Sequence, residues 1–141
     1  MEKVYVENDW YDGPRKGVAD LNGVPHRFIA HFKEESGYED TFFLFPISPD
    51  ILNLEIEQWR IFTEWNDKYD AGKADTDSHP GHGEINNRWD ELDRMLQSSR
   101  SVIPETTLIA RATFKEIEQA KRYEKKGPSY KVVWHIISES A

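Results

Sequence analysis

The chain has 141 residues, of which 38% are hydrophobic, 13% aromatic and 31% charged, and its formal net charge is −8. This length suits one globular domain with a real core, which we expect to span residues 1–141, and the aromatic content, with five tryptophans, excludes a disordered chain. The lack of cysteine excludes a disulfide framework, thiol catalysis and cysteine-ligated zinc.

The charge is unevenly distributed along the chain. Residues 1–110 carry 22 acidic and 11 basic groups, a net charge of −11, whereas residues 111–141 carry 4 acidic and 7 basic groups, a net charge of +3. An acidic body repels phosphate, so the sequence predicts no nucleic-acid binding and favours a basic protein partner, with simple solubility as the alternative explanation. No signal peptide and no membrane-length apolar run is present, so we expect a cytoplasmic protein without a membrane partner.

The N-terminal third reads as a meander of strands. Residues 3–7 predict a short strand, and a dense group of turn-forming residues follows at 8–15. Residues 17–21 and 24–33 predict a hairpin, because Asn22-Gly23 between them is typical of a type I′ turn.

A two-residue turn also fixes which residues of this hairpin face each other. The expected pairs are Leu21 with Val24, Ala19 with His26, and Gly17 with Phe28. His26 therefore projects from the apolar face, opposite a small residue. Two interpretations stay open: a core histidine with one satisfied hydrogen bond, or a histidine that lines a pocket where Ala19 leaves room.

The segment that follows leads into the longest helix. Residues 34–40 read as an acidic loop, and the unbroken apolar run at 42–45 predicts a strand covered on both faces. Residues 48–73 then predict a helix with Ser48 as N-cap, Pro49 in the first turn and Gly72 as the C-terminal stop.

One side of this helix carries an apolar stripe. Its members step by three or four residues: Leu52, Ile56, Trp59, Phe62, Trp65 and Tyr69. We expect the stripe to form core against a sheet or another helix. The charged residues, Glu55 among them, are expected to fill the rest of the helix surface.

The linker after this helix holds four side chains of metal-ligating type within eight residues: Asp75, Asp77, His79 and His82. Carboxylates and imidazoles bind zinc and other transition metals, so a metal site is one hypothesis. A loop with glycine and proline has no rigid face that would preorganise these ligands, and a solvated linker is the alternative.

The C-terminal half completes the expected fold. Residues 84–99 predict a second helix that folds back antiparallel on the first, with Ile85, Trp89, Leu92 and Met95 or Leu96 on its apolar face. Residues 108–115 and 130–137 alternate as strands. The basic stretch between them, residues 116–128, is interpreted as an exposed, solvated hairpin end. The fold class is therefore α+β: an antiparallel sheet of about five or six strands, N-terminal meander plus C-terminal hairpin, packed against two antiparallel helices.

A loop near the N-terminus gathers polar and aromatic groups around a tight bend. Tyr11, Asp12 and Arg15 could bind a small polar ligand together with His26. The alternative is an internal brace, in which Asp12 caps the turn and Arg15 pairs with a nearby acid. The run YDGPR-x-GVA followed by G-x-PH-x-F resembles a group of small, uncharacterised bacterial proteins, a likeness that extends to the helix and linker. The resemblance implies a bacterial cytosolic domain and no known activity.

No motif in the chain assigns a reaction. It has no glycine-rich phosphate loop, dinucleotide fingerprint or nucleophile elbow, so the sequence predicts no cofactor and indicates no catalytic residue. The leading hypothesis is a non-enzymatic protein-interaction or regulatory module with an acidic surface. The alternative is a small-ligand-binding protein or enzyme with a pocket near Tyr11, Asp12, Arg15 and His26.

Overall fold

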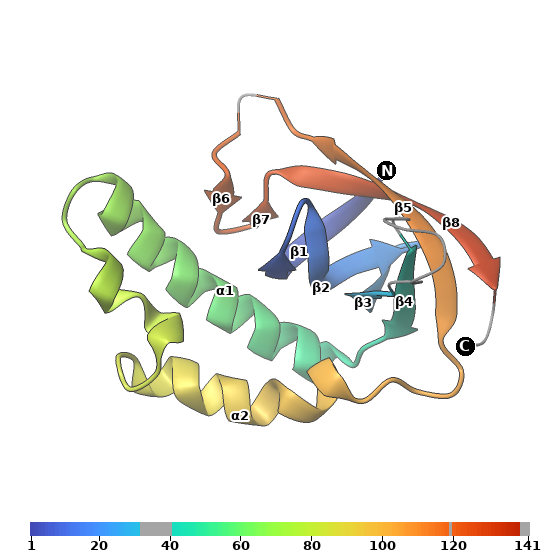
Figure 1. The fold of residues 1–141 in the computed structure, drawn as a ribbon, viewed down its shortest axis with the longest axis horizontal. Helices are drawn as coiled ribbons and strands as arrows, with labels where there is room; N and C mark the ends of the chain where they lie inside the picture. Colours follow the sequence, from blue (N-terminus) through green and yellow to red (C-terminus); the bar gives the residue numbers. More distant parts are fainter. Residues whose placement is uncertain (32–40, 119, 139–141) are drawn as a thin grey trace.

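The computed structural model describes residues 1–31, 41–118 and 120–138. Four strands come first, followed by two helices and then the remaining strands (Figure 1). The long elements are β1 (Glu2–Trp10), β2 (Pro14–Leu21), β3 (Val24–Ala30), β4 (Thr41–Pro46), α1 (Pro49–Asp70), α2 (Asn87–Ser101), β5 (Leu108–Glu116) and β8 (Tyr130–Ser138). The short ones are the 3-10 turns η1 (Thr76–Ser78) and η2 (Pro80–His82) and the strands β6 (Tyr123–Glu124) and β7 (Gly127–Pro128).

The six long strands form a closed antiparallel barrel in the order β1-β2-β3-β4-β5-β8. The barrel closes where β8 pairs with β1, with Glu2 opposite Val132 and Lys3 opposite Lys131. The predicted α+β class and the antiparallel sheet are confirmed. Closure was not part of the prediction, and it removes the sheet edges that an open sheet would leave unpaired.

The hairpin between β2 and β3 has the predicted register. Leu21 pairs with Val24, Ala19 with His26 and Gly17 with Phe28. Asn22 and Gly23 both have positive φ angles, 53° and 76°, as a type I′ turn requires. The predicted continuation of this strand through residues 32 and 33, and the acidic loop at 34–40, lie outside the described residues.

Side chains fill the interior of the barrel. The buried cluster comprises Val4, Ala19, Phe28, Phe42, Leu44, Ala110, Ala112, Tyr130 and Val132. Phe28, Phe42, Phe114 and Trp134 contact one another there with ring centroids 5.7–6.1 Å apart. The barrel is thus a packed core, and binding sites must be sought on its outside.

Helix α1 has the predicted caps. The Ser48 hydroxyl accepts from the backbone N–H of Ile51 at 3.2 Å, and Gly72 adopts a φ of 72° just beyond the last turn. The prediction for α2 was wrong at its start. Its N-cap is Asn86, whose side chain accepts from the Trp89 N–H, so Ile85 precedes the helix and is exposed.

The two helices form a helical hairpin (residues 49–101) that lies along one side of the barrel (Figure 1). Trp59 of α1 packs with Val6 and Val18 of the barrel wall. The predicted stripe is only partly buried, and Tyr69 at its end is exposed. The assignment of Glu55 to the helix surface was wrong: Glu55, Gln58, Trp59 and Thr63 are the buried residues of α1. No helix among the described residues is both long and apolar enough to cross a membrane.

The basic stretch after β5 is not simply a solvated end. Its strands β6 and β7 pair with each other, and Gly127 and Pro128 are buried. The Trp59 indole N–H donates to the backbone carbonyl of Glu124 at 2.6 Å. This small hairpin therefore holds the middle of α1 against the barrel.

Candidate functional site

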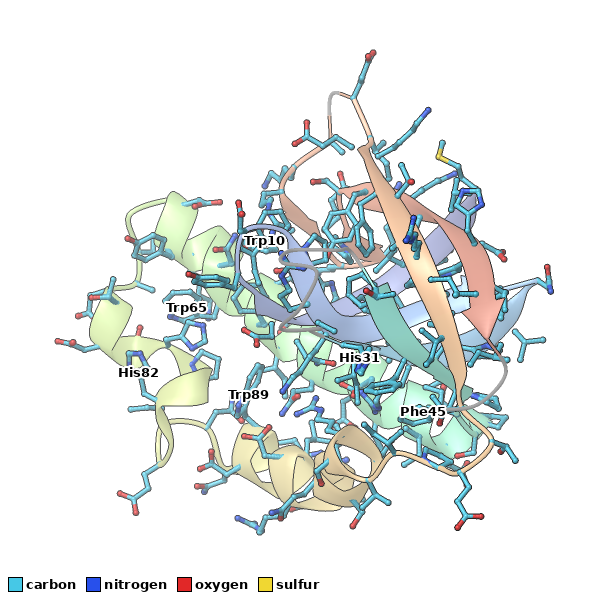
Figure 2. All side chains as sticks on the ribbon, turned by 45° about the vertical axis from the view of Figure 1, so that its right-hand side comes forward. Trp10, His31, Phe45, Trp65, His82 and Trp89 are labelled. Carbon is cyan, nitrogen blue, oxygen red and sulfur yellow. The ribbon has the colours of Figure 1, made fainter. Side chains whose placement is uncertain are left out.

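A pocket of about 260 Å³ lies between the barrel and the helical hairpin. We call it the aromatic pocket. Its lining comes from β1 (Val6, Glu7, Asn8, Asp9, Trp10), from α1 (Glu55, Gln58, Trp59, Phe62), from the linker (His79) and from α2 (Trp89). In Figure 2, Trp10 lies on the barrel side and Trp89 on the helical side.

Aromatic rings form much of its lining. Trp59 and Phe62 contact each other with centroids 5.5 Å apart, and both contact Tyr123 behind them. Trp10 is about half exposed, at 49%, and Trp89 is partly buried. Large rings held from three elements make a rigid apolar surface that a flat molecule can stack against.

The inner end of the pocket holds a buried ion pair. Glu55 is 1% exposed and accepts from Arg27 of β3, itself 1% exposed, at 2.7 Å. Arg100 of α2 donates to both carboxylate oxygens, at 2.5 Å and 3.1 Å. One carboxylate thus joins the barrel wall to both helices.

The neighbouring polar groups complete this network. Asn8 donates to Glu55 at 3.3 Å, and Gln58 accepts from Arg100 at 2.6 Å while donating to Asp93 at 2.7 Å. Burial is the largest single influence on the pKa of Glu55 and acts to raise it. The hydrogen bonds and charges of Arg100 and Arg27 together outweigh burial, so the pKa lies below its usual value and Glu55 stays ionised.

The outer rim is braced by a second buried acid. Glu7 accepts from Arg122 at 2.8 Å and from the Tyr130 hydroxyl at 2.7 Å. Burial first, and then the nearby Glu7 charge, raise the pKa of Tyr130 far above its usual value. The Arg122 guanidinium also lies over the Trp10 ring, 4.4 Å from its centroid. These contacts orient Trp10 and leave Glu7 already paired.

His79 adds one polar group to the wall. Its Nδ1 accepts from the Gly81 N–H at 2.8 Å, so the neutral ring carries its hydrogen on Nε2. Burial, and then the charge of His82, lower the pKa of His79 and favour this neutral form. The ring packs against Trp65 at 4.6 Å and Phe62 at 5.6 Å. His79 can therefore offer a ligand one N–H donor from an aromatic surface.

Three residues of the predicted polar site, Tyr11, Asp12 and Arg15, lie together in their loop, whereas His26 lies apart from them. Tyr11 is 65% exposed, and Arg15 is buried and donates to the backbone carbonyls of Tyr11 and Asp12 at 2.6 Å and 2.9 Å. His26 is buried, and its Nδ1 lies 2.7 Å from the Val24 carbonyl of its own strand. His26 pairs with Ala19, four residues along β2 from Arg15 and hence roughly 13 Å away. Arg15 thus holds the turn through backbone carbonyls, where the brace alternative named an acid, and His26 occupies a buried position beside its own strand.

The predicted metal-ligating residues are placed around the two 3-10 turns. The Asp75 carboxylate caps the first turn by accepting from the Ser78 N–H at 3.1 Å. The His79 and His82 rings stack with centroids 5.4 Å apart, while Asp77 is exposed. Among the described residues, no group of three or more His, Asp or Glu side chains is placed to hold a metal ion.

Sequence reasoning missed most of the aromatic pocket, because its lining comes from positions 6–10, 55–62, 79 and 89. One signal was available: Glu55 stands three residues after Leu52 and four before Trp59, on the apolar side of the helix. No known family model, curated protein or solved structure matches this chain.

Proposed function

We propose that this protein binds a small organic molecule in the aromatic pocket. The observation that carries the proposal is a hollow of about 260 Å³ that is bounded by four aromatic rings and by polar side chains between them. The rings are those of Trp10, Trp59, Phe62 and Trp89, and the polar side chains are those of Glu7, Asn8, Asp9, Glu55, Gln58 and His79. Small-molecule sites are typically concave, mostly apolar and furnished with a few fixed polar groups. The ligand-binding alternative of the sequence reasoning is thereby favoured, at a different place from Tyr11, Asp12, Arg15 and His26.

The lining also indicates what kind of molecule fits. Arg27 and Arg100 engage both oxygens of the Glu55 carboxylate, and Arg122 engages one oxygen of Glu7. The third acid of the lining, Asp9, is exposed. Trp and Phe faces favour a planar ring, which gains area and offset stacking together. We therefore expect a compound with one or two flat rings, held by contact with the walls and by a hydrogen bond from His79.

The test is a thermal-shift screen of metabolites on the full chain. A ligand at 100 times its dissociation constant stabilises the folded state by roughly 2.7 kcal/mol, a clear upward shift in Tm. Two neighbouring variants locate the effect. Trp10→Ala removes a wall of the pocket, whereas Tyr11→Ala removes an exposed ring that does not line it.

We expect the shift to shrink in Trp10→Ala and to persist in Tyr11→Ala. A panel rich in aromatic compounds that moves the Tm of neither the wild type nor Tyr11→Ala would contradict ligand binding. An equal loss of the ligand-induced Tm shift in both variants would contradict the placement of the binding site in the aromatic pocket.

A second candidate function is docking of a basic protein partner on the helical hairpin. Residues 49–101 carry 12 acidic and 6 basic groups, a net charge of −6 out of the −8 of the whole chain. Concentrated charge of one sign steers an oppositely charged partner and raises its association rate.

This candidate is tested by affinity purification from the native host. The wild type is compared with a variant in which exposed Glu64, Asp77 and Glu84 become Gln, Asn and Gln. A stoichiometric partner lost at high salt and weakened by the variant supports docking. Recovery of the bait alone counts against it.

A further inference from the structure

A second hollow adjoins the aromatic pocket. It measures about 240 Å³, and its lining consists of Asn8, Asp9, Lys16, Arg27, Ile29 and Arg100. We call it the polar hollow. Asn8 and Asp9 line both spaces, so the polar hollow lies directly beside the aromatic pocket.

Arg27 reaches this hollow with a donor to spare. Its Nε and Nη2 donate to the Ser99 hydroxyl at 3.2 Å and 2.9 Å, and its Nη1 contacts Glu55 and Asn8. A guanidinium has five N–H groups, and these contacts engage four of them. Within the described residues, one Nη2 hydrogen of Arg27 has no acceptor.

Arg100 also has one guanidinium N–H that is not used within the described residues. Its Nε and Nη2 are engaged by Glu55 and Gln58, and its Nη1 donates one hydrogen to Asp93 at 3.2 Å. The second Nη1 hydrogen has no acceptor among residues 1–31, 41–118 and 120–138. Both guanidiniums that line the polar hollow therefore retain hydrogen-bonding capacity for an additional acceptor.

The local charge balance favours an anion as that acceptor. Arg27 and Arg100 share one buried carboxylate, that of Glu55, which leaves one positive charge in excess. Asp93 offsets it only in part, because its side chain is half exposed. Asp9 opposes an anion at the rim, but Lys16 is its cross-strand partner and carries the opposite charge.

We propose that the polar hollow is a subsite for the acidic group of the molecule bound in the aromatic pocket. The ligand class is thus a planar aromatic compound that carries a carboxylate or a phosphate. This inference rests on the proposed function. It adds the acidic group, which Arg27 and Arg100 recognise by charge-assisted hydrogen bonds.

Calorimetric titration of the full chain with four probes tests it. Indole supplies the ring alone, indole-3-acetate adds a carboxylate, 3-indoxyl phosphate adds a phosphate, and tryptamine adds an ammonium group instead. A charge-assisted hydrogen bond predicts that the better acidic probe binds at least about tenfold more tightly than indole. The two acidic probes distinguish carboxylate from phosphate as the natural group.

Variants of the two exposed rim charges sharpen the test without touching the buried network. Asp9→Asn removes the opposing charge and should raise the preference for the acidic probe by about threefold, whereas Lys16→Gln should lower it by a similar factor. Lys115→Gln is the matched control, because Lys115 is an exposed lysine on β5. In the barrel β5 pairs with β4 and β8, and not with β1, β2 or β3, which line the polar hollow.

The outcomes separate this inference from the proposal on which it rests. Indole binding that Trp10→Ala weakens, with no advantage for either acidic probe or with a preference for tryptamine, would overturn the acidic subsite and leave the aromatic pocket intact. Failure of all four probes to bind would overturn both. An acidic preference that changes equally in Lys16→Gln and Lys115→Gln would also overturn the assignment.

Discussion

Replacing Glu55 by Gln tests the electrostatic centre of the molecule. Gln has nearly the same shape, but it carries no charge and offers one acceptor oxygen in place of two. The Glu55 carboxylate receives hydrogen bonds from Arg27, Arg100 and Asn8 and is 1% exposed. The variant would leave Arg27 without its counter-charge and Arg100 with only the half-exposed Asp93.

Breaking a buried ion pair from one side typically costs 3–5 kcal/mol. That is a large part of the roughly 5–15 kcal/mol by which a domain is usually stable. For a chain of this length, 1 kcal/mol corresponds to about 3–4 °C in Tm, so we expect Glu55→Gln to lower Tm by about 10–15 °C.

The assay is thermal and urea unfolding followed by circular dichroism. The matched control is Glu57→Gln, two residues along the same helix, whose carboxylate pairs with Arg88 at the surface. Exposed ion pairs contribute little, so we expect a much smaller change in the control. Equal changes in the two variants would refute the view that the buried network joins the helices to the barrel.

Three further predictions concern the pH dependence of Glu55, a close contact at Gly17 and the N-cap of α1. Since the pKa of Glu55 is depressed below 4.5, its contribution to the free energy of unfolding is complete above that pH and is lost as pH falls through the folded-state pKa. In urea unfolding, the stability difference between wild type and Glu55→Gln should therefore stay constant from pH 7 to 5 and shrink below about 4.5. A difference that shrinks already above about pH 5 would contradict this. Gly17→Ala should destabilise the barrel by about 3 kcal/mol or more, because a Cβ would lie 2.3 Å from the Val6 carbonyl oxygen and 2.7 Å from the Phe28 ring. A Tm of the variant within about 3 °C of the wild-type value would disprove that close approach. Ser48→Ala should cost about 1 kcal/mol in urea unfolding through loss of the N-cap of α1, and an unchanged midpoint would mean that the cap contributes nothing.

Local signals in the sequence predicted much of the fold. Asn22-Gly23 sets both the turn and the register of β2 with β3, because a two-residue turn leaves no freedom in the pairing. Ser48 and Gly72 mark the ends of α1 through bonds and backbone angles that involve only neighbouring residues. Barrel closure depends on β1 meeting β8, residues about 130 positions apart, and no local pattern specifies it.

The site was harder to predict than the fold for the same reason. The aromatic pocket takes Trp10, Trp59 and Trp89 from three elements, and no spacing in the sequence relates them. Glu55 was expected on the surface because an isolated acid is costly to bury. Its burial becomes favourable only when Arg27 and Arg100, from two other elements, reach it together. The YDGPR loop shows the reverse, since its polar groups are adjacent in sequence but engage their own backbone.

The tryptophans themselves provide the most direct test of ligand binding between barrel and helices. The measurement is a titration of the ¹⁵N-labelled protein with the best ligand of the thermal screen, in which the indole N–H resonances are followed by NMR. We predict that the signals of Trp10, Trp59 and Trp89 shift in parallel, while that of Trp134, which packs inside the barrel, does not move. Shifts at Trp134 with none at the three pocket tryptophans would contradict the assignment of this pocket as the functional site.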